Sequence, residues 1–375
     1  MERRDIMRSK AYKKLLSTGI ALSLGFSISY TILPNHSAYA FNWGNAIGAV
    51  AITGIQYQQL EQQLNYLDND GRNEYFNQIK TKLGENTDPY YNNLLDNIMS
   101  RLTYSISLSD PEIKEKPYNY FVNPNEEYNA FCTVGHNLSV NTGMFKLLNN
   151  NEDELAIVIG HELAHGEEKH VQSSAKKSFS VKLLANLYAS QNPDLLSIIG
   201  TNVLANNMIA KGITKNQEQE ADDIAFNYTV GAGYNIGAGA ATWQRFMDKM
   251  GESNKNFVGE LFSPSDHPSH QSRRDNYADK LTKYSNNAIH VDGKDGSIYI
   301  KDTKFFTPTP ANDMSSQERA YLIAGNLAAV YHNNPQNPAT AYLSGNTIYM
   351  GKQAIMVVTN NENGTELVNQ LNNIR

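Results

Sequence analysis

Apolar residues recur at helical spacing over most of the chain and change to an alternating pattern towards its C-terminal end. Spacings of three and four predict helices, whereas a spacing of two predicts strands. On this basis we expect helices at residues 45–67, from Asp88-Pro89 to Leu102, in apolar segments within 181–210, and around Glu218. The larger part of the chain is therefore predicted to be mainly helical.

A further helix is predicted to begin after Asn151. Asn151 is a favourable N-cap residue, and Glu154 three positions later completes a capping-box pattern. Gly160 lowers the helix propensity, which suggests that another element packs close to the backbone there. The apolar face of this helix consists of Leu155, Val158, Ile159, Leu163 and Ala164. We therefore expect this helix to be a buried element of the fold.

The composition changes near residues 286–290, and the pattern beyond this point differs. We expect strands at 289–306 around an Asp295-Gly296 turn, a helix at 315–332, a hairpin at 340–358 around Gly345-Asn346, and a short helix at 366–374. The predicted fold class is α+β, with a mainly helical domain containing a small sheet at 41–287 and an accessory α/β domain at 288–375. The C-terminal region contains no recognisable catalytic cluster, and binding of a partner or substrate is its simplest role.

The N-terminus has the pattern of a secretory signal peptide. Residues 1–14 carry six basic and two acidic side chains, a net charge of +4. Fairly apolar, uncharged residues follow at 15–33, and Ala38-Tyr39-Ala40 forms a small-residue cleavage pattern. We therefore predict a signal peptide at 1–40, a mature chain starting near Phe41, and a periplasmic or extracellular location. An uncleaved membrane anchor is the alternative, because the apolar run approaches spanning length.

The formal net charge is −6, so removal of the +4 segment leaves about −10 for the remainder. Such an acidic chain is a poor ligand for nucleic acid, and we expect no nucleic-acid partner. The apolar residues at 194–209 are expected to form core, with membrane proximity as the alternative. Cys132 is the only cysteine, which excludes an intramolecular disulfide and a cysteine-rich structural metal site.

The most informative segment is His161-Glu162-Leu163-Ala164-His165. Histidines four residues apart lie on one face of a helix, where two ring nitrogens can bind one Zn²⁺. Glu162 lies about 100° around the same helix, where it can take a proton from a zinc-activated water. This spacing is typical of zinc hydrolases, although the motif alone is only moderately specific.

A hydrolytic zinc site needs a third protein ligand and an open position. His170 is one candidate, but on a continuous helix it would lie opposite His161, which favours a helix-end or second-shell role. Glu218 is the better candidate, because Asp222 lies four residues later on the same helical face while Glu220 points nearly the other way. Asp222 could then accept a hydrogen bond from a ligand imidazole. Taken alone, these acidic residues favour a solvated helix face, and the upstream His161–His165 motif reverses that preference.

The order of several short motifs resembles the gluzincin family of the CAAX prenyl endoprotease and the HtpX-like and Oma-like peptidases. Together the motifs span roughly residues 88 to 283. The matching segments are Asn129-Ala130-Phe131, Gly135-His136-Asn137-Leu138-Ser139-Val140-Asn141-Thr142-Gly143, Glu152-Asp153-Glu154-Leu155, Gly160-His161-Glu162-Leu163-Ala164-His165, Lys169-His170, Glu218-Gln219-Glu220-Ala221-Asp222, His267-Pro268 and Arg273. His136 departs from the family pattern, which usually has glycine there, and we interpret it as a loop histidine.

This resemblance implies a zincin-type metallopeptidase that binds one Zn²⁺ per chain and cleaves protein or peptide substrates. It assigns the metal to His161, His165 and Glu218, and catalysis to Glu162 as general base. Asp222 and Arg273 would support the ligands. His267 would stabilise the oxyanion or, on a closed loop, occupy the fourth zinc position. Substrate contacts fall to Asn129, Ala130 and Phe131 and to Leu138, Ser139 and Val140, the latter resembling an edge strand that pairs with an extended peptide.

Two other functions fit part of the pattern. A chaperone-like assembly factor could use a largely latent peptidase fold to hold client proteins, but it would not need the base Glu162. A purely structural zinc module would fill all four coordination positions. We therefore predict an exported zinc-dependent endopeptidase.

Overall fold

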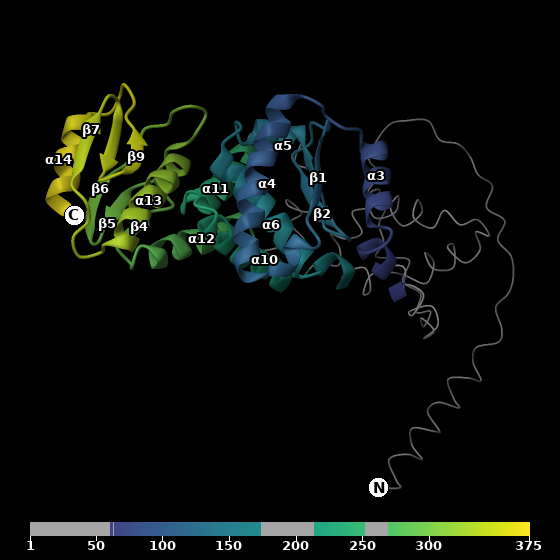
Figure 1. Ribbon diagram of the computed structural model, residues 1–375. Helices are drawn as coiled ribbons and strands as arrows, with labels where there is room; N and C mark the ends of the chain where they lie inside the picture. Colours follow the sequence, from purple (N-terminus) through teal and green to yellow (C-terminus); the bar gives the residue numbers. More distant parts are fainter. Residues whose placement is uncertain (1–60, 63, 174–213, 252–268) are drawn as a thin grey trace, which may run out of the picture. The chain divides into compact units, whose positions relative to one another are not determined.

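The computed structural model describes residues 61–62, 64–173, 214–251 and 269–375 (Figure 1). The predicted signal peptide, most of the predicted helix at 45–67, the apolar segments at 181–210 and His267 lie outside these residues. The helices before residue 287 are α3 (Arg72–Leu83), α4 (Pro89–Ser109), the 3₁₀ turn η2 (Pro111–Lys114), α5 (Thr142–Leu147), α6 (Glu152–Glu167), α10 (Lys215–Gly231), α11 (Ala238–Gly251) and α12 (His270–Tyr284). In the part of the chain that the structure describes, no helix has the length and apolarity needed to cross a bilayer.

Helix α4 begins where the sequence predicts. The side chain of Asp88 accepts a hydrogen bond from the Tyr90 N–H, and Pro89 occupies the first turn. Proline is suited to this position because its missing N–H would have no intrahelical partner. The helix continues beyond the predicted end at Leu102, because Leu102 and Ile106 are both fully buried and extend its apolar face.

The N-terminus of helix α6 is capped by Asn151 as predicted, but the reciprocal hydrogen bond of a capping box is missing. The Asn151 side chain accepts hydrogen bonds from the N–H groups of Asp153 and Glu154. The capping box is absent, because the Asn151 N–H donates to the Leu148 carbonyl and the Glu154 side chain is fully buried beside Arg245. Glu154 therefore belongs to the core between helices rather than to the cap.

A three-stranded sheet precedes α6 in the sequence and packs against this helix. Its strands are β1 (Asn119–Asn123), β2 (Ala130–Thr133) and β3 (Asn137–Asn141), in the order β1-β3-β2. Strand β3 pairs in parallel with β1 and antiparallel with β2. The prediction that Leu138, Ser139 and Val140 form an edge strand is therefore wrong, because both sides of β3 are occupied. Among the described strands of this sheet, β2 pairs only with β3, and it packs against α6.

The C-terminal region follows the predicted order of elements, except that residues 340–358 form three antiparallel strands where a hairpin was predicted. It contains β4 (Ile289–Val291), β5 (Ile298–Ile300), β6 (Thr303–Phe306), α13 (Ser316–Asn333), β7 (Ala341–Ser344), β8 (Thr347–Met350), β9 (Gln353–Val357) and α14 (Gly364–Ile374). The strands form two antiparallel sheets, β4-β5-β6 and β7-β8-β9. Helix α13 packs against α11 and α12 as well as against β4 and β9. The fold is thus α+β and mainly helical, as predicted, whereas the division at residue 287 stays a prediction.

Candidate active site

Two helices supply the side chains of the candidate site. Helix α6 carries His161, Glu162 and His165, and α10 carries Glu218 and Asp222. Helix α10 starts with a complete capping box between Thr214 and Gln217, which fixes its first turn directly before Glu218. The two helices pack extensively, with Thr229 and Ala225 of α10 facing the backbone at Gly160. Another element therefore packs against the backbone at Gly160 as the sequence predicts, although a Cβ there would still lie 3.5 Å from Thr229 Cγ2.

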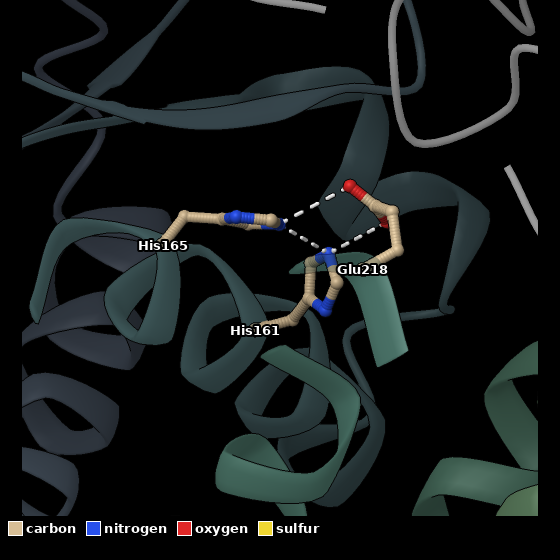
Figure 2. A group of neighbouring side chains, drawn as sticks. All are labelled: His161, His165 and Glu218. Carbon is tan, nitrogen blue, oxygen red and sulfur yellow. Dashed lines mark hydrogen bonds and ion pairs between the residues drawn. The ribbon is translucent and has the colours of Figure 1, made fainter. Parts of the chain in front are cut away.

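The side chains of His161, His165 and Glu218 converge on one point (Figure 2). The Nε2 atoms of the two histidines lie 3.0 Å apart. Oε2 of Glu218 lies 3.4 Å from Nε2 of His161, and Oε1 lies 3.4 Å from Nε2 of His165. All three side chains are buried.

These separations fit a tetrahedral zinc site. Bonds of 2.0–2.1 Å to zinc place neighbouring ligand atoms about 3.3 Å apart. Two imidazole nitrogens and one carboxylate oxygen are also ligand types that Zn²⁺ prefers, and three protein ligands leave one position open. The residues present therefore fit the metal that the sequence predicts.

The second nitrogen of His161 is held by Asp222, whose Oδ1 lies 3.1 Å from Nδ1. Nη2 of Arg273 lies equally near to this nitrogen. Because a guanidinium has no acceptor, only one of the two groups can be the partner. If Nε2 faces the metal, Nδ1 carries the proton and donates it to Asp222, while Arg273 binds the Asp222 carboxylate. The predicted placement of Asp222 and Arg273 beside the ligands thus agrees with the geometry.

Glu162 extends from α6 towards strand β2. Its Oε2 accepts a hydrogen bond of 3.1 Å from the Cys132 N–H, and the side chain is buried. Burial raises the pKa of Glu162 to about 7, although the charge of His161 and the bond from Cys132 oppose this shift. A carboxylate with such a pKa can both accept and release a proton near neutral pH.

The pKa values of the two candidate ligand histidines shift in opposite directions. Burial and the Arg273 charge lower the pKa of His161, but its hydrogen bonds to Asp222 and Glu218 outweigh them and raise the pKa to about 9. Burial and the neighbouring His161 lower the pKa of His165. A metal cation would compete with the His161 proton, so metal binding at this site releases protons.

His170 lies beside His165, not on the opposite side of the helix as the sequence argument assumed. His170 would lie opposite His161 only on a continuous helix. Helix α6 instead ends at Glu167, and Lys169 adopts a positive φ of 52°. The chain therefore turns back, and Nδ1 of His170 lies 2.9 Å from Nδ1 of His165. His170 is not one of the three converging residues, and its role at the helix end or beside a ligand stays a prediction.

The predicted substrate residues lie in two places, at strand β2 and in strand β3. Asn129 accepts a hydrogen bond from the Asn141 N–H, and Ala130 and Phe131 lie on strand β2 near Glu162. Leu138, Ser139 and Val140 are buried in the central strand and cannot pair with a peptide. His136 lies in the turn between β2 and β3 with a φ of 54° and stacks on Tyr118, as expected of a loop histidine.

Two aromatic residues near the site were missed by the sequence argument. The Tyr277 hydroxyl donates a hydrogen bond of 3.1 Å to Asp222, and the Trp243 ring lies 3.7 Å from the Arg273 guanidinium carbon. Tyr277 could have been found, because it lies four residues after Arg273 on the same face of α12. Trp243 lies on α11, and only the tertiary structure brings it to the site.

Residues 91–278 match the model of peptidase family M48. The beta-barrel assembly-enhancing protease of Escherichia coli is 26% identical over 191 residues, which are 48% of this chain and 38% of that protein. Metalloprotease LoiP of Escherichia coli is 27% identical over 188 residues, 48% of this chain and 70% of LoiP. The mitochondrial metalloendopeptidase OMA1 of Arabidopsis thaliana is 30% identical over 149 residues, 39% of this chain and 28% of OMA1.

The chain thus spans less than half the length of the beta-barrel assembly-enhancing protease that it matches. The match to the family model covers half of the chain and includes α4, the β1-β3-β2 sheet, α6, α10 and Arg273. The protein therefore belongs to peptidase family M48.

Proposed function

We propose that this protein is an exported zinc-dependent endopeptidase that hydrolyses peptide bonds of protein substrates. The observation that carries the proposal is the convergence of His161, His165 and Glu218 at ligand distances, with Glu162 directly beside them. These three residues would hold one Zn²⁺ per chain. When bound, the zinc supplies Lewis acidity that makes water nucleophilic near neutral pH.

Glu162 acts as the general base. Its Oε atoms take a proton from the attacking water and later deliver it to the leaving amine, a role for which a pKa of about 7 is suited. Asp222 fixes the tautomer of His161, and Arg273 holds Asp222 in place. His267 remains a predicted oxyanion or fourth-ligand residue.

Strand β2 binds the substrate in place of β3. The N–H of Cys132 points from β2 to Glu162, so the side of β2 that does not pair with β3 faces the candidate catalytic base. An extended peptide pairing with this side would bring its main chain beside Glu162. Binding through the main chain gives low sequence selectivity, so protein substrates in general are proposed.

Export is proposed from the signal-peptide pattern at 1–40, with a periplasmic or extracellular destination. N-terminal sequencing of the exported protein tests it, since the mature chain should begin near Phe41. Intact Met1 recovered in a membrane fraction would instead support the anchored alternative.

A second candidate function is that of a chaperone-like assembly factor with a largely latent peptidase site. The name of the beta-barrel assembly-enhancing proteases favours it, because it describes assembly as well as proteolysis for those proteins. A variant without the base separates the two functions. An assembly factor would keep its activity without Glu162, whereas an endopeptidase would not.

The decisive experiment compares Glu162→Gln with Glu218→Gln. We expect Glu162→Gln to keep one zinc per chain while proteolysis falls by at least about 1000-fold, because only the proton transfer is lost. Glu218→Gln should lose zinc itself, because an amide is a weak zinc ligand. Metal analysis and cleavage of an unfolded protein substrate measure both effects.

The matched control is Glu168→Gln, which changes an exposed carboxylate just beyond α6 and should alter neither quantity. Proteolysis by Glu162→Gln at the wild-type rate would refute the proposed mechanism. Wild-type zinc affinity in Glu218→Gln would refute the assignment of the third ligand.

A further inference from the structure

The two candidate zinc-binding histidines are supported in different ways. An imidazole that faces a metal with Nε2 carries its proton on Nδ1, and this N–H needs an acceptor when it is buried. For His161 the acceptor is the Asp222 carboxylate, 3.1 Å away. For His165 the atom at hydrogen-bond distance is Nδ1 of His170, 2.9 Å away.

The geometry also fixes the tautomer of His170. If Nδ1 of His170 accepts the proton of His165, its own proton lies on Nε2. This nitrogen faces the carboxylate of Glu220, whose Oε2 lies 3.4 Å away. Glu220 was expected to point away from the ligand face of α10, but its half-exposed side chain reaches His170. Glu220 therefore contacts His170, and His170 in turn contacts His165.

The backbone around His170 is held in place by the same helix that supplies Glu218. The hydroxyl of Ser173 donates a hydrogen bond of 3.0 Å to the His170 carbonyl. The Gln217 side chain on α10 donates in turn to the Ser173 hydroxyl, also at 3.0 Å. These bonds hold the His170 backbone, and the His170 side chain is buried beside His165.

We propose that His170 is a positioning residue that orients His165 for zinc binding, and that Glu220 orients His170. This role rests on the proposed zinc site. His170 accepts the Nδ1 proton of His165 and so keeps the Nε2 lone pair of His165 directed at the point where the three ligands converge. The neutral imidazole replaces the carboxylate that supports His161, so the two ligands are held by chemically different partners.

Zinc affinity tests the proposal, measured on the full chain by competition between Zn²⁺ binding and a chelator. His170→Leu removes the acceptor and should weaken zinc binding about 10- to 100-fold. His170→Asn places an amide oxygen near the position of Nδ1 and should recover most of the affinity. Glu220→Gln should weaken zinc binding less than His170→Leu, and the control Glu168→Gln should not weaken it.

Nuclear magnetic resonance of the zinc-loaded wild type gives a second measurement that needs no variant. In protein with ¹⁵N-labelled histidine, an N–H···N bond between His165 and His170 produces a ¹⁵N–¹⁵N coupling between their Nδ1 atoms. Detection of this coupling supports the proposal. Its absence, or a proton on Nε2 of His165, overturns it even if His170→Leu fails to fold.

The variants also separate positioning from packing. If His170→Leu and His170→Asn lose equal affinity and equal thermal stability without metal, the role of His170 is structural and the proposal is wrong. If Glu162→Gln remains fully proteolytic, the proposed catalytic function fails, whereas the zinc affinities and the coupling still decide the role of His170.

Discussion

Arg273 and Asp222 form a buried ion pair that joins α12 to α10. Nε of Arg273 donates a hydrogen bond of 2.7 Å to Oδ2 of Asp222, and Nη2 donates to Oδ1. Both side chains are 1% exposed. Nη1 of Arg273 also lies 3.3 Å from Oε2 of Glu218, so one guanidinium contacts two buried carboxylates.

We expect Arg273→Met to lower the free energy of unfolding of the metal-free protein by about 3–5 kcal/mol, because it removes the buried guanidinium from Asp222 and Glu218 and leaves His161 as the cation that both carboxylates share. The loss should be smaller with zinc bound, since the metal compensates the Glu218 charge. Urea unfolding with and without Zn²⁺ measures both values.

Lys280→Met on the same helix is the matched control. Lys280 pairs with Asp223 at 2.7 Å in a partly exposed position, where an ion pair contributes less than about 1 kcal/mol. If both substitutions lowered the free energy of unfolding equally, the buried Arg273 pair would contribute no more than the partly exposed Lys280 pair.

A second prediction concerns the contact between α13 and the segment before α11. A Cβ on Gly325 would lie 2.0 Å from Oδ1 of Asn235 and 2.2 Å from the Gly237 nitrogen. Oδ1 of Asn235 also accepts a hydrogen bond of 2.8 Å from the Gly237 N–H, and the Asn235 N–H donates one of 2.9 Å to Asp153 on α6. We expect Gly325→Ala to destabilise the protein by about 1–3 kcal/mol through overpacking, measured by urea unfolding.

Gly160→Ala provides the comparison within α6. A Cβ there would meet Thr229 Cγ2 at 3.5 Å, an ordinary contact distance. Alanine in a helix interior is favoured over glycine by roughly 0.5–1 kcal/mol, so this variant should be as stable as wild type or more stable. A Gly325→Ala protein of unchanged stability would contradict the close packing of α13.

The elements of the fold were predictable where local sequence determines them. Asp88 and Asn151 cap α4 and α6 as expected, and the order of elements after residue 288 follows the alternation of apolar residues. The convergence of His161, His165 and Glu218 was also expected, because helical spacing places the two histidines on one face and the resemblance to the gluzincin family implies Glu218 as the third ligand. Their chemical roles stay predictions.

The incorrect predictions concern features that depend on contacts between segments distant in the sequence. The family resemblance implied an edge strand at Leu138, Ser139 and Val140, but the Ser139 hydroxyl accepts a buried hydrogen bond of 2.9 Å from Asn123 on β1. Strand order depends on such pairing, which no local pattern contains. The position of His170 depended on a single turn at Lys169, and the support of Arg273 by Trp243 depends on the packing of α11.

The last prediction concerns acid stability and the C-terminal region. Glu362 lies between β9 and α14, and its side chain is 4% exposed. Nη1 of Arg319 donates a hydrogen bond of 2.8 Å to it, and the N–H groups of Thr309 and Thr359 donate at 3.0 and 2.9 Å. Although burial raises the pKa of Glu362, these bonds outweigh it and lower the pKa to about 2, from an ordinary value of 4.5.

A carboxyl group with a lowered pKa in the folded state stabilises the protein above its unfolded-state pKa. This stabilisation is therefore complete above about pH 5 and is lost as the pH falls from 4.5 towards 2. We expect it to amount to about 2 kcal/mol.

Urea unfolding of Glu362→Gln between pH 7 and 3 should show a lower stability at pH 7 and a weaker decline with acid than the wild type. Glu366→Gln, an exposed carboxylate in the first turn of α14, should keep the wild-type decline. A Glu362→Gln curve parallel to that of the wild type would show that the Arg319 pair does not contribute to acid sensitivity.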